Sequence, residues 1–108
     1  MEKIYLAAPY GKTDKEETFK AVNKAAAHFI SKGCCVFSPI TQGHAIVQEN
    51  DLPDTYEFWD KHCIEFIKWC DTFVILMLDG WKDSNLEKHV IFAEGIDKDI
   101  RYVMPETI

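Results

Sequence analysis

The chain lacks an excess of basic charge and lacks any long apolar run. Its 108 residues include 12 lysines and arginines against 18 aspartates and glutamates, a formal net charge of −6. This balance argues against a nucleic-acid polymer or an anionic membrane as the main partner. The longest apolar run, Phe73–Leu78, is far too short to cross a bilayer. The acidic charge does not exclude a single nucleotide as a ligand, because backbone N–H groups at a helix start can hold one without a basic patch.

The four cysteines lack the paired short spacing of a zinc site, so we expect no metal. We also expect no cofactor. Cys34 and Cys35 are adjacent and would point to opposite faces of a strand, which suits packing better than a disulfide. The N-terminus enters an apolar segment at once, without the pattern of a signal peptide. The sequence therefore predicts a reduced, cytoplasmic protein.

Apolar segments alternate with segments of helical periodicity along one domain, residues 1–108. Strands are expected at Lys3–Ala7, Cys34–Phe37, Thr72–Leu78 and Ile100–Met104. Helices are expected at Asp14–Lys32, from a cap at Asp54 to about Trp69, and at Asn85–Glu94, with Gly33 and Gly95 just beyond the first and third. Such alternation predicts a parallel sheet in a flavodoxin-like or Rossmann-like three-layer α/β sandwich, with strand order 2-1-3-4.

Two connections in this arrangement are candidates for a binding site. Ser38–Pro53 has little periodicity and is expected to be a long loop, whose Gln42 and His44 can close over a ligand. Asp79–Ser84 joins the most apolar strand to a helix start, with Ser84 as cap and Glu87 as capping-box partner. Because ligands of open α/β sheets bind where strand carboxyl ends meet helix starts, we expect one wall of a site at Asp79–Ser84.

Several segments, in this order, resemble the nucleoside 2-deoxyribosyltransferase superfamily, in particular a small phage and bacterial branch known mainly as a domain of unknown function. The segments that carry the resemblance are Ile4–Tyr10, Phe19–Ala26, Val36–Ile40, Phe58–Trp59, Trp69–Asp71 and Leu76–Trp81. The resemblance implies a flavodoxin-like fold, a nucleoside or nucleotide as ligand, and a homo-oligomer.

The resemblance also implies a pair of carboxylates that this chain lacks. The family uses a glutamate on the third helix to attack C1′ of the sugar and an aspartate on the second helix to position it. Matching the family's third-helix motif through Asp83, Ser84 and Ala93 puts the nucleophile position on His89, and the aspartate position falls on Cys63. Glu87 and Glu94 lie roughly 200° and 140° around the helix from His89 and would point elsewhere.

The predicted strand order places a crevice between the first and third strands. The residues there that would contact a ligand are, by position and by resemblance, Ala8, Pro9, Tyr10, Gly11, Asp79, Gly80, Trp81, Ser84, Asn85 and His89. Each also has a structural interpretation. Asp79 can be a turn former, Trp81 a subunit contact and Ser84 a simple helix cap. His89 is a core histidine or a ligand contact. Cys63 is a small buried residue, or less simply a partner of His89 in a dyad.

The function expected from these patterns is binding rather than catalysis. The chain is interpreted as a nucleotide-binding relative without the catalytic carboxylates, which holds an adenosine- or ADP-ribose-type molecule. In a phage such a protein can sequester a nucleotide immune messenger, an anti-defence role. The alternatives are an N-glycosidic hydrolase or deoxyribosyltransferase acting on nucleosides or nucleotides, and an interaction subunit whose crevice is filled by its own side chains.

Overall fold

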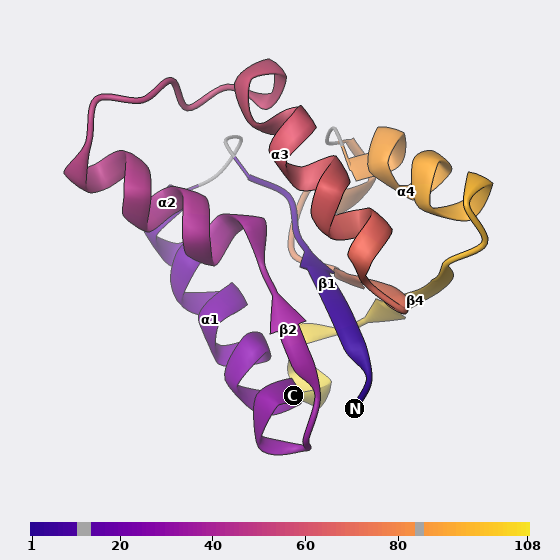
Figure 1. Ribbon diagram of the computed structural model, residues 1–108. Coiled ribbons are helices and arrows are strands. Elements are labelled where there is room, and N and C mark those ends of the chain that lie inside the picture. Colours follow the sequence, from indigo (N-terminus) through magenta and orange to yellow (C-terminus); the bar gives the residue numbers. More distant parts are fainter. Residues whose placement is uncertain (11–13, 84–85) are drawn as a thin grey trace.

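The computed structural model describes residues 1–10, 14–83 and 86–108, and its centre is a four-stranded parallel sheet (Figure 1). The strands are β1 (Lys3–Ala7), β2 (Cys35–Phe37), β3 (Thr72–Leu76) and β4 (Asp99–Val103). Their order is β2-β1-β3-β4, and the neighbouring strands pair in parallel. The predicted fold class and strand order are confirmed.

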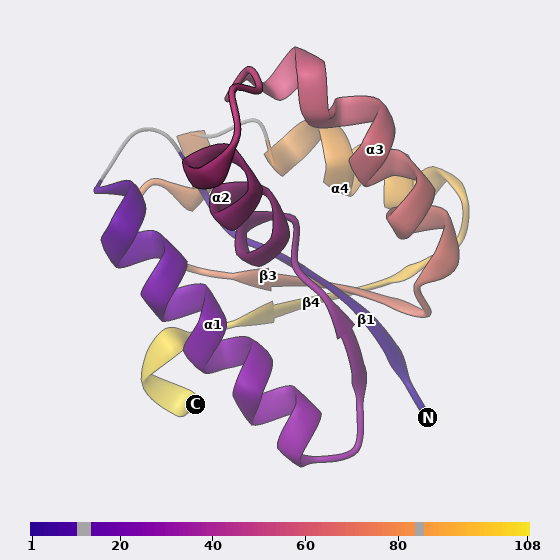
Figure 2. The ribbon, with the colours of Figure 1, turned by 60° about the vertical axis from the view of Figure 1, so that its left-hand side comes forward.

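Helices cover both faces of this sheet. They are α1 (Lys15–Ser31), α2 (Pro39–Glu49), α3 (Tyr56–Trp69) and α4 (Leu86–Gly95), with short 3-10 turns at Trp81–Asp83 and Pro105–Thr107. In Figures 1 and 2, α1 and α2 lie to one side of the strands and α3 and α4 to the other. No helix in the described part of the chain is long and apolar enough to span a bilayer.

Alternation along β1 divides the core between the two faces of the sheet. Ile4 and Leu6 pack with the α1 side chains, whereas Tyr5 and Ala7 pack with α3 and α4. All five residues of β3 are buried, as expected for a central parallel strand covered on both faces. The described core residues thus form two hydrophobic clusters, one on each face of the sheet.

The first helix is confirmed, but it is one residue shorter at each end than the predicted Asp14–Lys32, because Asp14 and Lys32 are its caps. The Asp14 side chain accepts hydrogen bonds from the backbone N–H groups of Glu16 and Glu17, and therefore caps α1. Gly33 follows the helix with φ of 92°, a conformation that favours glycine.

The prediction of a loop at Ser38–Pro53 was wrong, because most of this segment is α2. Ser38 caps the helix by accepting from the N–H of Thr41, and Pro39 occupies its first turn. Proline is tolerated there because its missing N–H would have no helical partner. Pro39 and Gly43 read as breakers in the sequence, but the Ser–Pro pair is a helix start and buried Ile40 and His44 lie one turn apart.

Smaller corrections concern the ends of elements. Thr55, rather than Asp54, caps α3, since its side chain accepts from the N–H of Phe58. The expected strand ends shift by one or two residues, to Cys35, Leu76, Asp99 and Val103. Gly95 is the last residue of α4 instead of the first beyond it. The predicted cap at Ser84 lies outside the described residues.

Candidate functional site

A cavity of about 420 Å³ opens beyond the carboxyl end of β1, between α2 on one side and α3 and α4 on the other. Ala7, Ala8 and Pro9 form part of its wall, and aromatic side chains contribute from two segments: Tyr10 after β1, and Tyr56 and Trp59 in α3. The cavity lies at the place where the chain switches from one side of β1 to the other, as in other doubly wound sheets. Its volume is within the range of roughly 300–1,000 Å³ that is usual for small-molecule sites.

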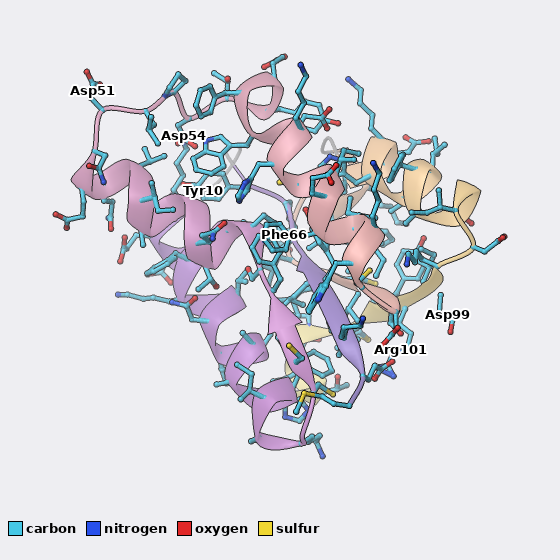
Figure 3. All side chains as sticks on the ribbon, in the orientation of Figure 1. Tyr10, Asp51, Asp54, Phe66, Asp99 and Arg101 are labelled. Atoms are coloured by element: carbon cyan, nitrogen blue, oxygen red, sulfur yellow. The ribbon has the colours of Figure 1, made fainter. Side chains whose placement is uncertain are left out.

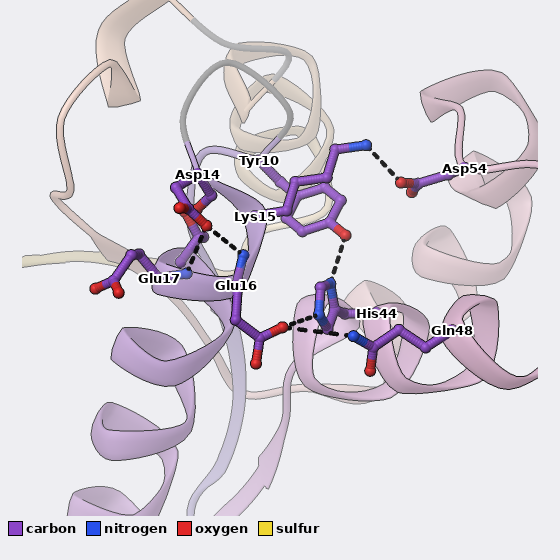
Figure 4. Close-up of polar contacts among 9 residues, drawn as sticks. Tyr10, Asp14, Lys15, Glu16, Glu17, His44, Gln48 and Asp54 are labelled. Carbon is purple, nitrogen blue, oxygen red and sulfur yellow. Dashed lines mark hydrogen bonds and ion pairs between the residues drawn. The ribbon is translucent and has the colours of Figure 1, made fainter.

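A chain of hydrogen bonds runs from the cavity to the surface (Figure 4). Tyr10 Oη lies 2.8 Å from His44 Nδ1, and His44 Nε2 lies 3.0 Å from Glu16 Oε2. His44 is buried and stacks on Phe19, while half of the Glu16 side chain is exposed. Burial, followed by the charges of Asp54 and Glu16, raises the pKa of Tyr10 to about 12, so the phenol stays protonated at neutral pH.

An ion pair closes one side of the cavity. Lys15 Nζ lies 2.7 Å from Asp54 Oδ2 and 5.3 Å from the centre of the Tyr10 ring. The pair joins the start of α1 to the segment before α3, and Tyr10 and Asp54 lie on the same side of the molecule (Figures 3 and 4). Both partners are partly exposed, so the pair contributes about 0–1 kcal/mol to stability.

A second imidazole–carboxylate pair lies on the α3 and α4 side. His89 Nε2 is 2.8 Å from Asp60 Oδ1, and the Tyr56 ring lies 5.3 Å from the His89 ring. Hydrogen bonds from His89 and, to a smaller extent, Tyr56 lower the pKa of Asp60 although partial burial opposes them. The ionised carboxylate accepts the Nε2 proton, which leaves Nδ1 of a neutral His89 as an acceptor.

Two neutral groups complete the wall. Tyr5 is 1% exposed, and within the described residues its hydroxyl bonds to no nitrogen or oxygen atom. The thiol of Cys63 lies beside it as a weak partner. Burial raises the pKa of both Tyr5 and Cys63, so both keep their protons at neutral pH. This protonated state does not support Cys63 as a nucleophile, because the thiolate is the reactive form of cysteine.

Residues 2–102 match the sequence model of the family described as a domain of unknown function (DUF1937). The chain belongs to this family. No curated protein matches it.

Some of the residues expected at the site of this DUF1937 domain line the cavity and others do not. Ala8, Pro9, Tyr10, His89 and Cys63 line it, although they come from three parts of the chain. Gly11, Ser84 and Asn85 lie outside the described residues.

One wall of the site was expected at Asp79–Ser84, but Asp79, Gly80 and Trp81 do not line this cavity. Gly80 has φ of 85°, so its role is that of a turn glycine. Trp81 packs on Tyr102, with ring centres 5.5 Å apart, and lines a separate cavity of about 170 Å³ beside α4. The turn after β3 thus directs the tryptophan toward β4 rather than toward β1.

The sequence patterns did not reveal several side chains of the site, namely Lys15, Asp54, Tyr56, Trp59 and Asp60. His44 was expected near a ligand, but on a loop rather than on a helix. Glu87 and Glu94 are exposed and do not line the cavity, as their helical positions predict. In the described part of the DUF1937 domain, no cluster of three or more metal-binding side chains is present.

Proposed function

We propose that the protein is a nucleotide-binding protein that holds an adenosine- or ADP-ribose-type molecule and does not cleave it. The observation that carries the proposal is the cavity at β1, which is lined by aromatic rings and by two imidazoles, His44 and His89, each hydrogen-bonded to a carboxylate behind it. Aromatic faces stack on bases of any kind, and hydrogen-bonding groups match the hydroxyls of a sugar. The resemblance to the nucleoside 2-deoxyribosyltransferase superfamily supports the same class of ligand.

The groups around the cavity favour binding over covalent chemistry. A glycosyl-enzyme needs a free carboxylate beside the sugar. Among the described residues that line the cavity, the only carboxylate is Asp54, which pairs with Lys15. His89 stands at the position that the resemblance gives to the nucleophile, and an imidazole is a poor substitute for a carboxylate there.

Sequestration is the biological part of this proposal. A protein that binds a nucleotide tightly and leaves it intact lowers the free concentration of that nucleotide in proportion to the protein present. The resemblance to a phage branch makes an NAD-derived immune messenger the ligand of interest. Protein purified from cells that make such a messenger should release it on denaturation, as detected by mass spectrometry. Release of no nucleotide from these cells would contradict the sequestration role.

Calorimetric titration tests the binding function directly. The panel contains nucleosides, nucleoside monophosphates and ADP-ribose, and each ligand is recovered afterwards and analysed by chromatography. We expect saturable heat with at least one member and recovery of the intact ligand. The absence of heat for every member would remove the proposal.

The pair formed by Asp60 and His89 favours an enzyme as the second candidate. Nδ1 of a neutral His89 can take a proton from a water molecule that attacks C1′, while the C1′–N bond breaks and the base leaves with a proton from solvent. This would be an N-glycosidic hydrolase, or a deoxyribosyltransferase if a second base replaces water. Release of free base from nucleosides or nucleotides, lost in His89→Ala, would favour it over binding.

A homo-oligomer is part of the proposal as well, because the resemblance implies one and the chain carries three tryptophans for its length. Light scattering at micromolar concentration should give more than the monomer mass of 12.5 kDa. A monomer at that concentration would contradict it.

A further inference from the structure

We infer that the cavity recognises a hydrogen-bond donor on its ligand, an exocyclic amino group of the base, through the hydroxyl oxygen of Tyr10. The hydrogen bonds from Tyr10 through His44 to Glu16 fix this oxygen as an acceptor. The inference rests on the proposed nucleoside-type ligand and names the class of base that fits.

The direction of the hydrogen bonds begins at Glu16. An ionised carboxylate has no proton to give, so the proton in the 3.0 Å contact belongs to His44 Nε2. A neutral imidazole carries one proton, and therefore His44 Nδ1 is an acceptor. Gln48 Nε2 also donates to Glu16, at 3.4 Å, which keeps the carboxylate facing α2.

The direction of the hydrogen bond between Tyr10 and His44 follows from this. The Tyr10 O–H must donate to His44 Nδ1 across 2.8 Å, and the raised pKa of Tyr10 keeps that proton in place. The oxygen then offers only lone pairs to the cavity that both residues line. A ligand N–H can donate to it, whereas a ligand carbonyl would bring two acceptors together and leave both unsatisfied.

The base is the part of the ligand expected at Tyr10. The opposite wall carries Tyr56 and His89, with Asp60 behind them, and this group suits the hydroxyls of a sugar. Tyr10 is instead an aromatic ring on the α2 side, at the end of β1. Adenine and cytosine present an amino group where hypoxanthine and uracil present a carbonyl, so these pairs of bases isolate the contact.

Titrations at pH 8, where an ordinary imidazole is neutral, compare adenosine with inosine and cytidine with uridine. We expect each amino-bearing nucleoside to bind about tenfold or more tightly than its carbonyl partner. Tyr10→Phe should weaken the binding of adenosine and bring the ratio of the affinities for adenosine and inosine close to one.

Glu16→Lys tests the direction of these hydrogen bonds, and Glu16 does not itself line the cavity. A lysine ammonium only donates, so His44 Nε2 becomes the acceptor and its Nδ1 donates to Tyr10. The Tyr10 proton is then free to meet a carbonyl, and the adenosine-to-inosine ratio should fall to one or below. Glu17→Lys is the matched control, since Glu17 is an exposed acidic residue in the same turn, and it should keep the wild-type ratio.

The outcomes separate this inference from the function on which it rests. Equal affinity of the wild-type protein for adenosine and inosine would overturn the inference and leave nucleoside binding established. Equal changes in Glu16→Lys and Glu17→Lys would also overturn it, because they would show a general charge effect. The absence of heat with all four nucleosides would remove both the inference and nucleoside binding.

Discussion

Removing one oxygen atom from each of two tyrosines of the same cavity should change stability in opposite directions. The Tyr5 hydroxyl is buried beside the Cys63 thiol and finds no nitrogen or oxygen partner among the described residues. The Tyr10 hydroxyl makes a 2.8 Å hydrogen bond to His44 Nδ1. Tyr→Phe deletes the same atom at both positions and leaves the ring, so the partner of the hydroxyl is the main difference.

The magnitudes follow from the cost of an unsatisfied group. An unsatisfied buried hydroxyl costs about 1–3 kcal/mol, and the weak Cys63 thiol offsets only part of this cost, so Tyr5→Phe should raise the free energy of unfolding by about 1 kcal/mol. A made hydrogen bond contributes about 1 kcal/mol, so Tyr10→Phe should lower that free energy by a similar amount. In a domain of this size, 1 kcal/mol corresponds to a shift of about 4–8 °C in the melting temperature.

Urea unfolding of the ligand-free protein, followed by tryptophan fluorescence, measures both changes. The two variants should share the wild-type m-value and differ only in midpoint, because neither alters the surface exposed on unfolding. A loss of 1 kcal/mol or more in Tyr5→Phe would refute the reasoning, since it would mean that the buried hydroxyl has a strong partner. Tyr10→Phe with wild-type stability would equally refute the energetic value of the bond to His44.

Three further outcomes can be checked. The pKa of Asp60 is lowered in the folded protein, so its stabilisation is present above about pH 4 and lost as pH falls through the folded pKa. Asp60→Asn should therefore be less stable than wild type at pH 7, with the gap closing in acid, and a gap constant with pH in urea melts would contradict this. Ile67 is fully buried, so Ile67→Ala should lower the free energy of unfolding by about 2–5 kcal/mol. Ile91 is exposed, so Ile91→Ala should change that free energy by less than about 0.5 kcal/mol. Cys63 is buried and its raised pKa keeps it a thiol, so iodoacetamide at pH 7 should label half-buried Cys34 first, and mass spectrometry showing faster labelling of Cys63 would oppose this.

Most of the fold could be predicted because its signals are local. The β3 segment is apolar at every position, which is typical of a strand covered on both faces, and it is buried throughout. Asp14 and Gly33 mark the ends of α1 through side-chain capping and a positive φ, which depend only on neighbouring residues.

The α2 helix was not predicted because the local sequence signals for a helix conflict in this segment. Pro39 and Gly43 have low helix propensity, and only one side of the helix is buried, at Ile40 and His44. Packing against α1 and β1 holds it as a helix, and this stabilisation has no counterpart in a single-segment pattern. His44 was therefore expected on a long loop, whereas it lies on a helix.

By itself the sequence determined the strands, most of the helices and the strand order, and it predicted a crevice between the first and third strands. These follow from periodicity, capping and the handedness of parallel crossovers, all of which act over short stretches of chain. Only the tertiary structure decided which side chains meet, as between Tyr10 and His44, 34 residues apart, or Asp60 and His89, 29 apart. Such pairs depend on how helices are rotated and set against the sheet, and side-chain packing across the core controls that geometry.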